Sequence, residues 1–85
     1  MNKYLAKITI TLRSGILDVQ GKTVERALHS IEFGMMSGVR IGKYVELTID
    51  AENEVTAGEL AADACSKLIA NPIIEDYQID IAGSR

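Results

Sequence analysis

The chain has 85 residues, which suits one small domain, and 47% of them are hydrophobic and 25% charged, as in an ordinary soluble globule. Its net charge of −3 comes from interspersed acidic and basic residues, which disfavours nucleic-acid binding because that requires clustered Lys and Arg. The lone Cys65 excludes an internal disulfide, and no apolar run approaches the roughly 20 residues of a membrane span. We therefore expect a single domain, residues 1–85, of a cytoplasmic protein that binds neither nucleic acid nor membrane.

The first predicted element is a strand from Tyr4 to Leu12, because apolar and polar side chains alternate along it. A helix is expected next, with Asp18 as its N-cap residue and Gly34 as its C-terminal cap. Its apolar stripe follows the i, i+3, i+4, i+7 spacing of a helix face and consists of Val24, Ala27, Leu28 and Ile31.

Residues 39–50 alternate again, but Lys43 is out of phase. This pattern predicts either one long bent strand or two strands that meet near Gly42. Residues 73–81 form the last predicted strand, with Tyr77 on its inner face.

Between these strands a second helix is expected to open with a capping box of Thr56 and Glu59. It should end before Pro72, since proline cannot continue a helix. The side chains expected to face the core are Ala57, Leu60, Ala61, Ala64 and Leu68.

The order strand, helix, long or split strand, helix, strand indicates an α+β fold with an antiparallel sheet. We expect both helices to cover one face of the sheet, as a two-layer sandwich of ferredoxin-like plan. The other face would be polar and flat enough to meet a second copy, and it would carry Thr9, Thr11, Tyr44 and Thr48. Open strand edges would offer another route to association.

Gly21-Lys22-Thr23, at the start of the first predicted helix, raises the question of a phosphate-binding loop. Such a loop needs four residues between its two glycines, but five lie between Gly15 and Gly21. Asp18 would also place a carboxylate inside the anion site. We therefore interpret this stretch as a helix N-terminus with an exposed rim of mixed charge.

Catalytic chemistry has few candidates. Nucleophilic catalysis needs a base beside the nucleophile, and the single histidine, His29, is predicted to lie on the charged face of the first helix. Cys65 borders the apolar stripe of the second helix and is expected to be a small core residue. One His and one Cys cannot build a structural zinc site. We expect neither a catalytic residue nor a metal site in this chain.

An acylphosphatase-like enzyme is one alternative, because Val19-Gln20-Gly21 resembles the start of that family's phosphate loop and the family shares this length and fold. The family's pattern places an arginine four residues after the glycine, where this chain has Glu25. A carboxylate at that position would repel an acyl phosphate. The sequence also offers no good candidate for the family's catalytic asparagine.

Three segments carry a resemblance to a known family: GILDVQGKTVERAL (residues 15–28), VRIGKYVELTI (residues 39–49) and ANPIIEDYQIDI (residues 70–81). In order and spacing they resemble the PurS family, the small subunits of phosphoribosylformylglycinamidine synthase, over residues 7–81. That family usually has proline after the aspartate, where this chain has Val19. Proline suits the first position of a helix, so the difference agrees with Asp18 as the N-cap.

The resemblance implies a subunit without an active site of its own. The family's complex converts formylglycinamide ribonucleotide to formylglycinamidine ribonucleotide in purine biosynthesis, with ATP and glutamine. A large synthetase subunit would use ATP and magnesium, and a glutaminase subunit would release ammonia. This chain would need no cofactor. It would lie between the two as a dimer, or as a dimer of dimers, and assist ammonia transfer.

We expect six residues to contact partner subunits, because they interrupt or flank the core patterns and lie in the recognisable segments: Asp18, Gln20, Lys22, Arg40, Lys43 and Tyr44.

A free-standing ferredoxin-like regulator that binds a small metabolite is an alternative from another class of function. The sequence leaves open the stoichiometry, which residue contacts which subunit, and whether the chain gates the ammonia route or only positions it.

Overall fold

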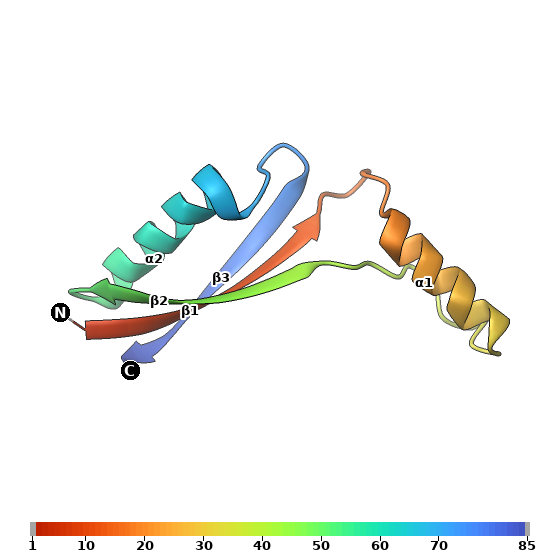
Figure 1. Ribbon diagram of the computed structural model, residues 1–85, viewed down its shortest axis with the longest axis horizontal. Coiled ribbons are helices and arrows are strands. Elements are labelled where there is room, and N and C mark those ends of the chain that lie inside the picture. The colour runs from red at the N-terminus through yellow and green to blue at the C-terminus, as the bar shows by residue number, and fades with distance from the viewer. Residues whose placement is uncertain (1, 85) are drawn as a thin grey trace.

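The computed structural model describes residues 2–84, which form an elongated molecule with two unequal parts (Figure 1). Its principal extents are 52 × 26 × 14 Å. The first part, which we call the body, contains a three-stranded sheet and helix α2 (Glu54–Ala64). The second, which we call the arm, comprises residues 13–42 and contains helix α1 (Val19–Ser30).

The sheet is antiparallel with the strand order β2-β1-β3, so β1 lies in the centre. Its strands are β1 (Asn2–Leu12), β2 (Lys43–Ala51) and β3 (Glu75–Ser84). Ile8 of β1 lies opposite Val45 on one side and Ile79 on the other. Because side chains alternate between faces along a strand, this register places the apolar residues of all three strands on one face.

The core lies between this face and α2. Ile8 and Ile10 are almost completely buried, and they pack in one cluster with Ala61 and Cys65 of the helix and its extension. These small helical side chains allow the helix axis to approach the sheet closely. The predictions that Cys65 is a core residue and that the sheet is antiparallel are confirmed.

α2 begins earlier than the sequence predicts. Asn53 is the N-cap residue, and its side-chain oxygen accepts a hydrogen bond from the Thr56 backbone N–H at 2.8 Å. The predicted capping box of Thr56 and Glu59 is therefore wrong. Asparagine caps a helix as well as threonine or better, so a cap three positions before the predicted one is physically reasonable.

α2 continues into a π-helical turn, η1 (Cys65–Ile69), closed by a 3.0 Å hydrogen bond from the Ala70 N–H to the Cys65 carbonyl. A wider turn shifts the following side chains around the helix axis. Ile69 consequently packs against the core, whereas Leu68 is 86% exposed. The prediction that Leu68 faces the core is wrong for this reason, and Leu60, at 47% exposed, lies on a flank of the helix instead of its buried side.

α1 does not cover the sheet. It lies beyond the end of the strands, and within residues 2–84 only α2 covers the inner sheet face (Figure 1). The α+β element order is confirmed, but the expectation that both helices cover one face is wrong. Residues 39–42, which lead into β2, do not turn back over the sheet, and α1 is held against them by the contacts described below.

The predicted long strand over residues 39–50 is a single strand, β2, preceded by an unpaired segment. A Cβ atom on Gly42 would lie 2.4 Å from the carbonyl oxygen of Ile10. This close approach explains a glycine at the point where the chain leaves the arm and enters the sheet.

α1 ends in a Schellman motif. Glu32 adopts a left-handed conformation with φ of 75°, and the Phe33 N–H donates to the Leu28 carbonyl at 2.9 Å. The predicted cap, Gly34, lies beyond this motif and is wrong. Glycine is the residue that usually marks this position at the end of a helix. Because this chain has glutamate there, the sequence does not indicate where α1 ends.

We expect Ile8→Val to lower the free energy of unfolding by about 0.5–1.5 kcal/mol, because it removes a methyl group from a fully buried site. Ile73→Val is the matched control, since Ile73 is 81% exposed, and it should change the stability by much less. Urea unfolding followed by circular dichroism measures both changes. Equal effects of the two substitutions would contradict this location of the core.

Candidate functional site

The residues predicted as site residues cluster around the arm and its junction with the body. The arm carries four of them, the first residue of β2 is the fifth, and the uncovered sheet face carries the sixth: Asp18, Gln20, Lys22, Arg40, Lys43 and Tyr44. The structure brings the first five to one end of the sheet. Tyr44 follows Lys43 but points to the face opposite α2.

Asp18 links the two segments of the arm. One carboxylate oxygen accepts from the Gly21 N–H at 2.8 Å and so caps α1, as predicted. The other oxygen accepts from the Ile41 N–H at 2.7 Å. One side chain therefore satisfies a backbone donor of the helix and one of the segment that leads into β2.

Glu25 and His29 extend this linkage along α1. A Glu25 carboxylate oxygen accepts from the Val39 N–H at 3.2 Å, and His29 Nε2 lies 2.7 Å from the Met36 carbonyl oxygen. Residues 18, 25 and 29 lie close to one line on the helix surface. Together they hold the returning segment, residues 36–41, alongside α1.

Gly21 allows the close approach that these bonds require. A Cβ atom at this position would lie 2.3 Å from the Val39 carbonyl oxygen, a separation that a real side chain could not tolerate. Gly21 is also the one buried residue of α1. The glycine of the Gly-Lys-Thr stretch therefore serves helix packing within the arm.

The electrostatics of the arm favour the ionised carboxylates. The hydrogen bonds from the Gly21 and Ile41 N–H groups, with the nearby Arg40 guanidinium, hold the pKa of Asp18 below its usual 3.8. The hydrogen bond from Val39, with the charge of Lys22, likewise lowers the pKa of Glu25 below 4.5. Both groups are charged acceptors at neutral pH.

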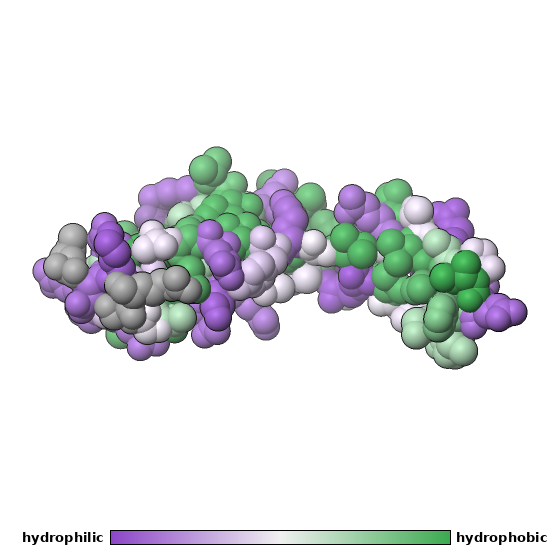
Figure 2. Space-filling model, turned by 60° about the horizontal axis from the view of Figure 1, so that its bottom comes forward, coloured by the Kyte–Doolittle hydropathy of each residue, from purple (hydrophilic) through white to green (hydrophobic). Residues whose placement is uncertain are grey.

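The opposite side of the arm is apolar and exposed. The predicted stripe forms a helix face as expected, but nothing in the described residues covers it, and Val24 and Ile31 are 39% and 60% exposed. Figure 2 shows green hydrophobic side chains gathered at the arm end of the molecule. Other exposed apolar residues of the arm are Ile16, Leu17, Val19, Phe33, Met35 and Met36.

Two cations make contacts at the junction of the arm and the body: Lys43 within the body, and Arg40 between the arm and the body. Lys43 Nζ lies 3.2 Å from a Glu75 carboxylate oxygen, and that carboxylate also accepts from the Asn71 N–H at 2.7 Å. The pKa of Glu75 is lowered mainly by the hydrogen bond from Asn71, and to a smaller extent by Lys43. Arg40 donates from its guanidinium to the Leu12 carbonyl at the end of β1. Asp18, Arg40 and Lys43 thus have partners inside the chain.

The uncovered sheet face is polar, as predicted. Lys7 at its centre lies opposite Glu46 on one neighbouring strand and Asp80 on the other. Tyr44 is 58% exposed, and its hydroxyl donates to Glu46 at 2.8 Å, which raises the pKa of Tyr44. Paired charges of this kind suit contact with water or with another polar protein surface.

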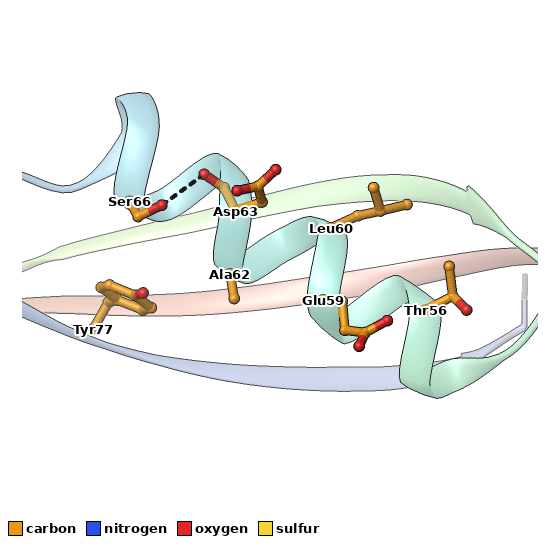
Figure 3. A pocket seen from close by; sticks show the side chains of 7 residues that line it. All are labelled: Thr56, Glu59, Leu60, Ala62, Asp63, Ser66 and Tyr77. Atoms are coloured by element: carbon orange, nitrogen blue, oxygen red, sulfur yellow. Dashed lines mark hydrogen bonds between the residues drawn. The ribbon is translucent and has the colours of Figure 1, made fainter.

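A shallow groove of about 560 Å³ runs along α2 (Figure 3). Its lining residues offer carboxylates, hydroxyl groups and apolar carbon: Thr56, Glu59, Leu60, Ala62, Asp63, Ser66 and Tyr77. The Ser66 hydroxyl donates to the Asp63 backbone carbonyl at 3.0 Å, so its proton is already engaged. The groove is open and brings no histidine or lysine next to a hydroxyl group.

Sequence reasoning missed three residues that organise the arm, namely Gly21, Glu25 and His29. Their signal is present in the sequence: Gly21 follows the N-cap by three positions, and Glu25 and His29 are one helical turn apart on the polar side of α1. Their partners, however, are backbone groups of a segment without regular structure, and such pairings have no sequence pattern.

Two further findings concern residues 2–84. Nowhere in this range do three or more His, Cys, Asp or Glu side chains converge as a metal site. Neither helix in the same range is long and apolar enough to span a membrane.

We expect acid to weaken the arm's carboxylate contacts. Both groups have lowered pKa values in the folded chain, so their contribution to stability is present above the ordinary values of 3.8 and 4.5 and is lost as the pH falls through the folded values. Carbon NMR titration of the side-chain carboxyls should therefore give midpoints below 3.8 for Asp18 and below 4.5 for Glu25. Midpoints at or above these values would contradict the hydrogen bonds described.

Comparison with known proteins identifies relatives over nearly the whole chain. Residues 5–83 match the family model PurS, described as phosphoribosylformylglycinamidine (FGAM) synthase. The PurS subunit of this synthase from Bacillus subtilis is 41% identical over 78 residues, which cover 92% of each chain. The PurS subunit of Mycobacterium leprae is 43% identical over 74 residues, 87% of this chain and 90% of the relative.

Solved structures agree in sequence and in shape. PurS of B. subtilis superposes with a TM-score of 0.82 at 40% identity, over 94% of this chain and 99% of that chain. A chain of the PurLQS structure from Thermotoga maritima superposes with a TM-score of 0.88 at 32% identity, over 96% of this chain and 100% of that chain. The agreement includes the projecting arm, because so high a coverage leaves out few residues. This chain therefore belongs to the PurS family of phosphoribosylformylglycinamidine synthase subunits.

Proposed function

We propose that this chain is the small subunit of a phosphoribosylformylglycinamidine synthase complex, where it bridges the large synthetase subunit and the glutaminase subunit and assists ammonia transfer. The observation that carries the proposal is the similarity over 96% of the chain to a component of the PurLQS assembly. The relatives favour this function over a free-standing regulator or an acylphosphatase-like enzyme. We place the activity in the cytoplasm.

We further propose that the subunit contributes no catalytic residue and binds no cofactor, while ATP and magnesium act in the large subunit. The chemistry of the candidate groups supports this. The Cys65 thiol is fully buried, and burial raises its pKa, which disfavours the reactive thiolate. His29 Nε2 is within hydrogen-bond distance of a backbone carbonyl. His29 belongs to α1 and Cys65 follows α2, and Figure 1 shows these two helices in separate parts of the molecule.

The exposed stripe of α1 supports a homodimer. A helix of 12 residues with one apolar face is marginal alone in water, and the body of its own chain does not cover that face. The inner sheet face offers a matching place beside α2, where Val45, Leu47 and Ile49 of β2 are only partly buried. Figure 3 shows Leu60 on the flank of α2 that points toward β2.

We therefore propose that α1 of one copy covers the inner sheet face of the other, next to α2, and the reverse. The exchange buries the stripe of both helices and completes both two-layer sandwiches. It uses the same surface patch twice, as a two-fold dimer requires. Further association into a dimer of dimers would use the polar sheet face or the open strand edges.

Gln20, Lys22 and Tyr44 remain our proposed contacts to the larger subunits, because their side chains are exposed and outside the contacts that hold the arm. Asp18, Arg40 and Lys43 would act on those partners through their position at the junction as well as by direct contact. The mixture of charges at this end of the sheet suits a polar protein interface.

Reconstitution tests the function. Glutamine-dependent synthase activity should be low with the large and glutaminase subunits alone and should rise when this chain is added, because the chain completes the assembly. The assay measures formation of the amidine product from glutamine. Absence of any rise with subunits from the same organism would contradict the bridging function.

Omitting the glutaminase and supplying ammonia in place of glutamine is the control, since direct ammonia should bypass the need for a bridge. In the same assay, Lys22→Glu should reduce activation, whereas Lys67→Glu in η1 should not. If both variants activate as well as the unmodified chain, Lys22 is not a contact.

The dimer is tested by Val24→Glu, which places a charge in the centre of the stripe. We expect sedimentation velocity to show a dimer for the unmodified chain and a folded monomer for the variant, because the body is stabilised independently of α1. Thr23→Glu is the matched control on the neighbouring, polar side of the helix, and it should remain a dimer. A dimeric Val24→Glu variant would exclude the stripe as the interface.

A further inference from the structure

The chain could in principle complete its own sandwich. α1 has 12 residues and a length of about 18 Å at 1.5 Å per residue. The whole connection from α1 to β2, residues 31–42, also has 12 residues and at roughly 3.3 Å per residue spans far more than that length. Chain length therefore permits α1 to fold back over its own sheet and to reach β2 again. Some other feature selects the projecting position.

The projecting position of α1 is determined first by the segment that precedes β2. The close approach of Gly42 to the Ile10 carbonyl and the hydrogen bond from Arg40 to the Leu12 carbonyl place residues 40–42 along the end of β1. They extend the line of β2 past the end of the sheet, as Figure 1 shows for the green strand and the loop that leads into it from α1.

α1 is then fixed to residues 39–41 by three contacts. They are the two hydrogen bonds from Ile41 to Asp18 and from Val39 to Glu25, and the packing of Gly21 on the Val39 carbonyl. The Ile41 bond is short and involves a charged acceptor, the strongest class of hydrogen bond in proteins. α1 consequently takes its direction from β2.

We propose that these three contacts form a clasp that holds α1 in the projecting position and so directs it to the sheet of a second copy instead of its own. The proposal deepens the proposed dimer and rests on it for the destination of α1. The clasp itself is a property of one chain. Its residues are positioning residues, and they touch neither substrate nor cofactor.

Asp18→Asn separates the two tasks of Asp18. Asparagine caps helices as well as aspartate, so α1 keeps its first turn. The amide has one acceptor oxygen for two donors, and its NH₂ group would meet the Ile41 N–H. Gly21→Ala is an independent variant, because the added methyl group meets the Val39 carbonyl at 2.3 Å, and Gly34→Ala is its control, since no atom lies within 4 Å of a Cβ there.

For both clasp variants we expect the Ile41 amide to exchange hydrogen at least about tenfold faster than in the unmodified chain. The dissociation constant of the dimer should rise by at least about tenfold. The monomer released should be more compact than the projecting form, whose Cα radius of gyration is 16.5 Å. Exchange by NMR, sedimentation and small-angle scattering measure the three effects, and Gly34→Ala should show none of them.

The outcomes separate the clasp from the dimer. An unmodified chain that is monomeric, extended and slow to exchange at Ile41 would support the clasp and contradict the dimer. Clasp variants that match the unmodified chain in Ile41 exchange and in dimer affinity would overturn the clasp. Loss of cooperative unfolding of the body in Asp18→Asn would overturn it as well, because the clasp lies outside the body.

Discussion

The arrangement of this molecule depends on one carboxylate that serves two backbone donors. Asp18 caps α1 through Gly21 and accepts from Ile41, 23 positions along the chain. An unpaired backbone N–H in a half-buried position is costly, so a side chain that satisfies two of them at once fixes the relative position of two segments. The helix, its returning segment and the start of β2 are consequently one structural unit.

The body depends on a different principle, which is close packing of small side chains. Ala57 and Ala61 of α2 and Cys65 of η1 form the buried side of the helix, so the helix lies near the sheet while its larger residues are on its flanks. A single helix placed in this way leaves part of the inner sheet face only half covered. The half-covered part of the sheet face and the exposed stripe of α1 have the same cause, because the apolar residues that could cover this part of the sheet lie on the projecting arm.

Much of this fold follows from periodicity. The alternating patterns predict all three strands, and Asp18 predicts the start of α1, because these signals are local. The π turn that exposes Leu68 and the Schellman motif at Glu32 are local too, but neither has a distinctive residue type at its critical position. Whether α1 covers its own sheet or projects depends on contacts between distant segments, and amphipathicity alone describes both arrangements equally well.

The same limit applies to the site. Its residues were predicted as surface contacts because they interrupt core patterns, yet Asp18, Arg40 and Lys43 are engaged inside the chain. An interruption of a hydrophobic pattern indicates a residue with a specific partner, and it does not indicate whether that partner belongs to the same chain.

A molecule only 14 Å thick has little interior, and few of its side chains are fully enclosed. Small domains bury a modest share of their surface on folding, and a flat one buries less than a sphere of equal mass. Association adds to the free energy that keeps the chain folded, so the stability of the chain rises with its own concentration and with that of its partners. A copy whose exposed apolar surface is covered by a partner is therefore more stable than a free copy.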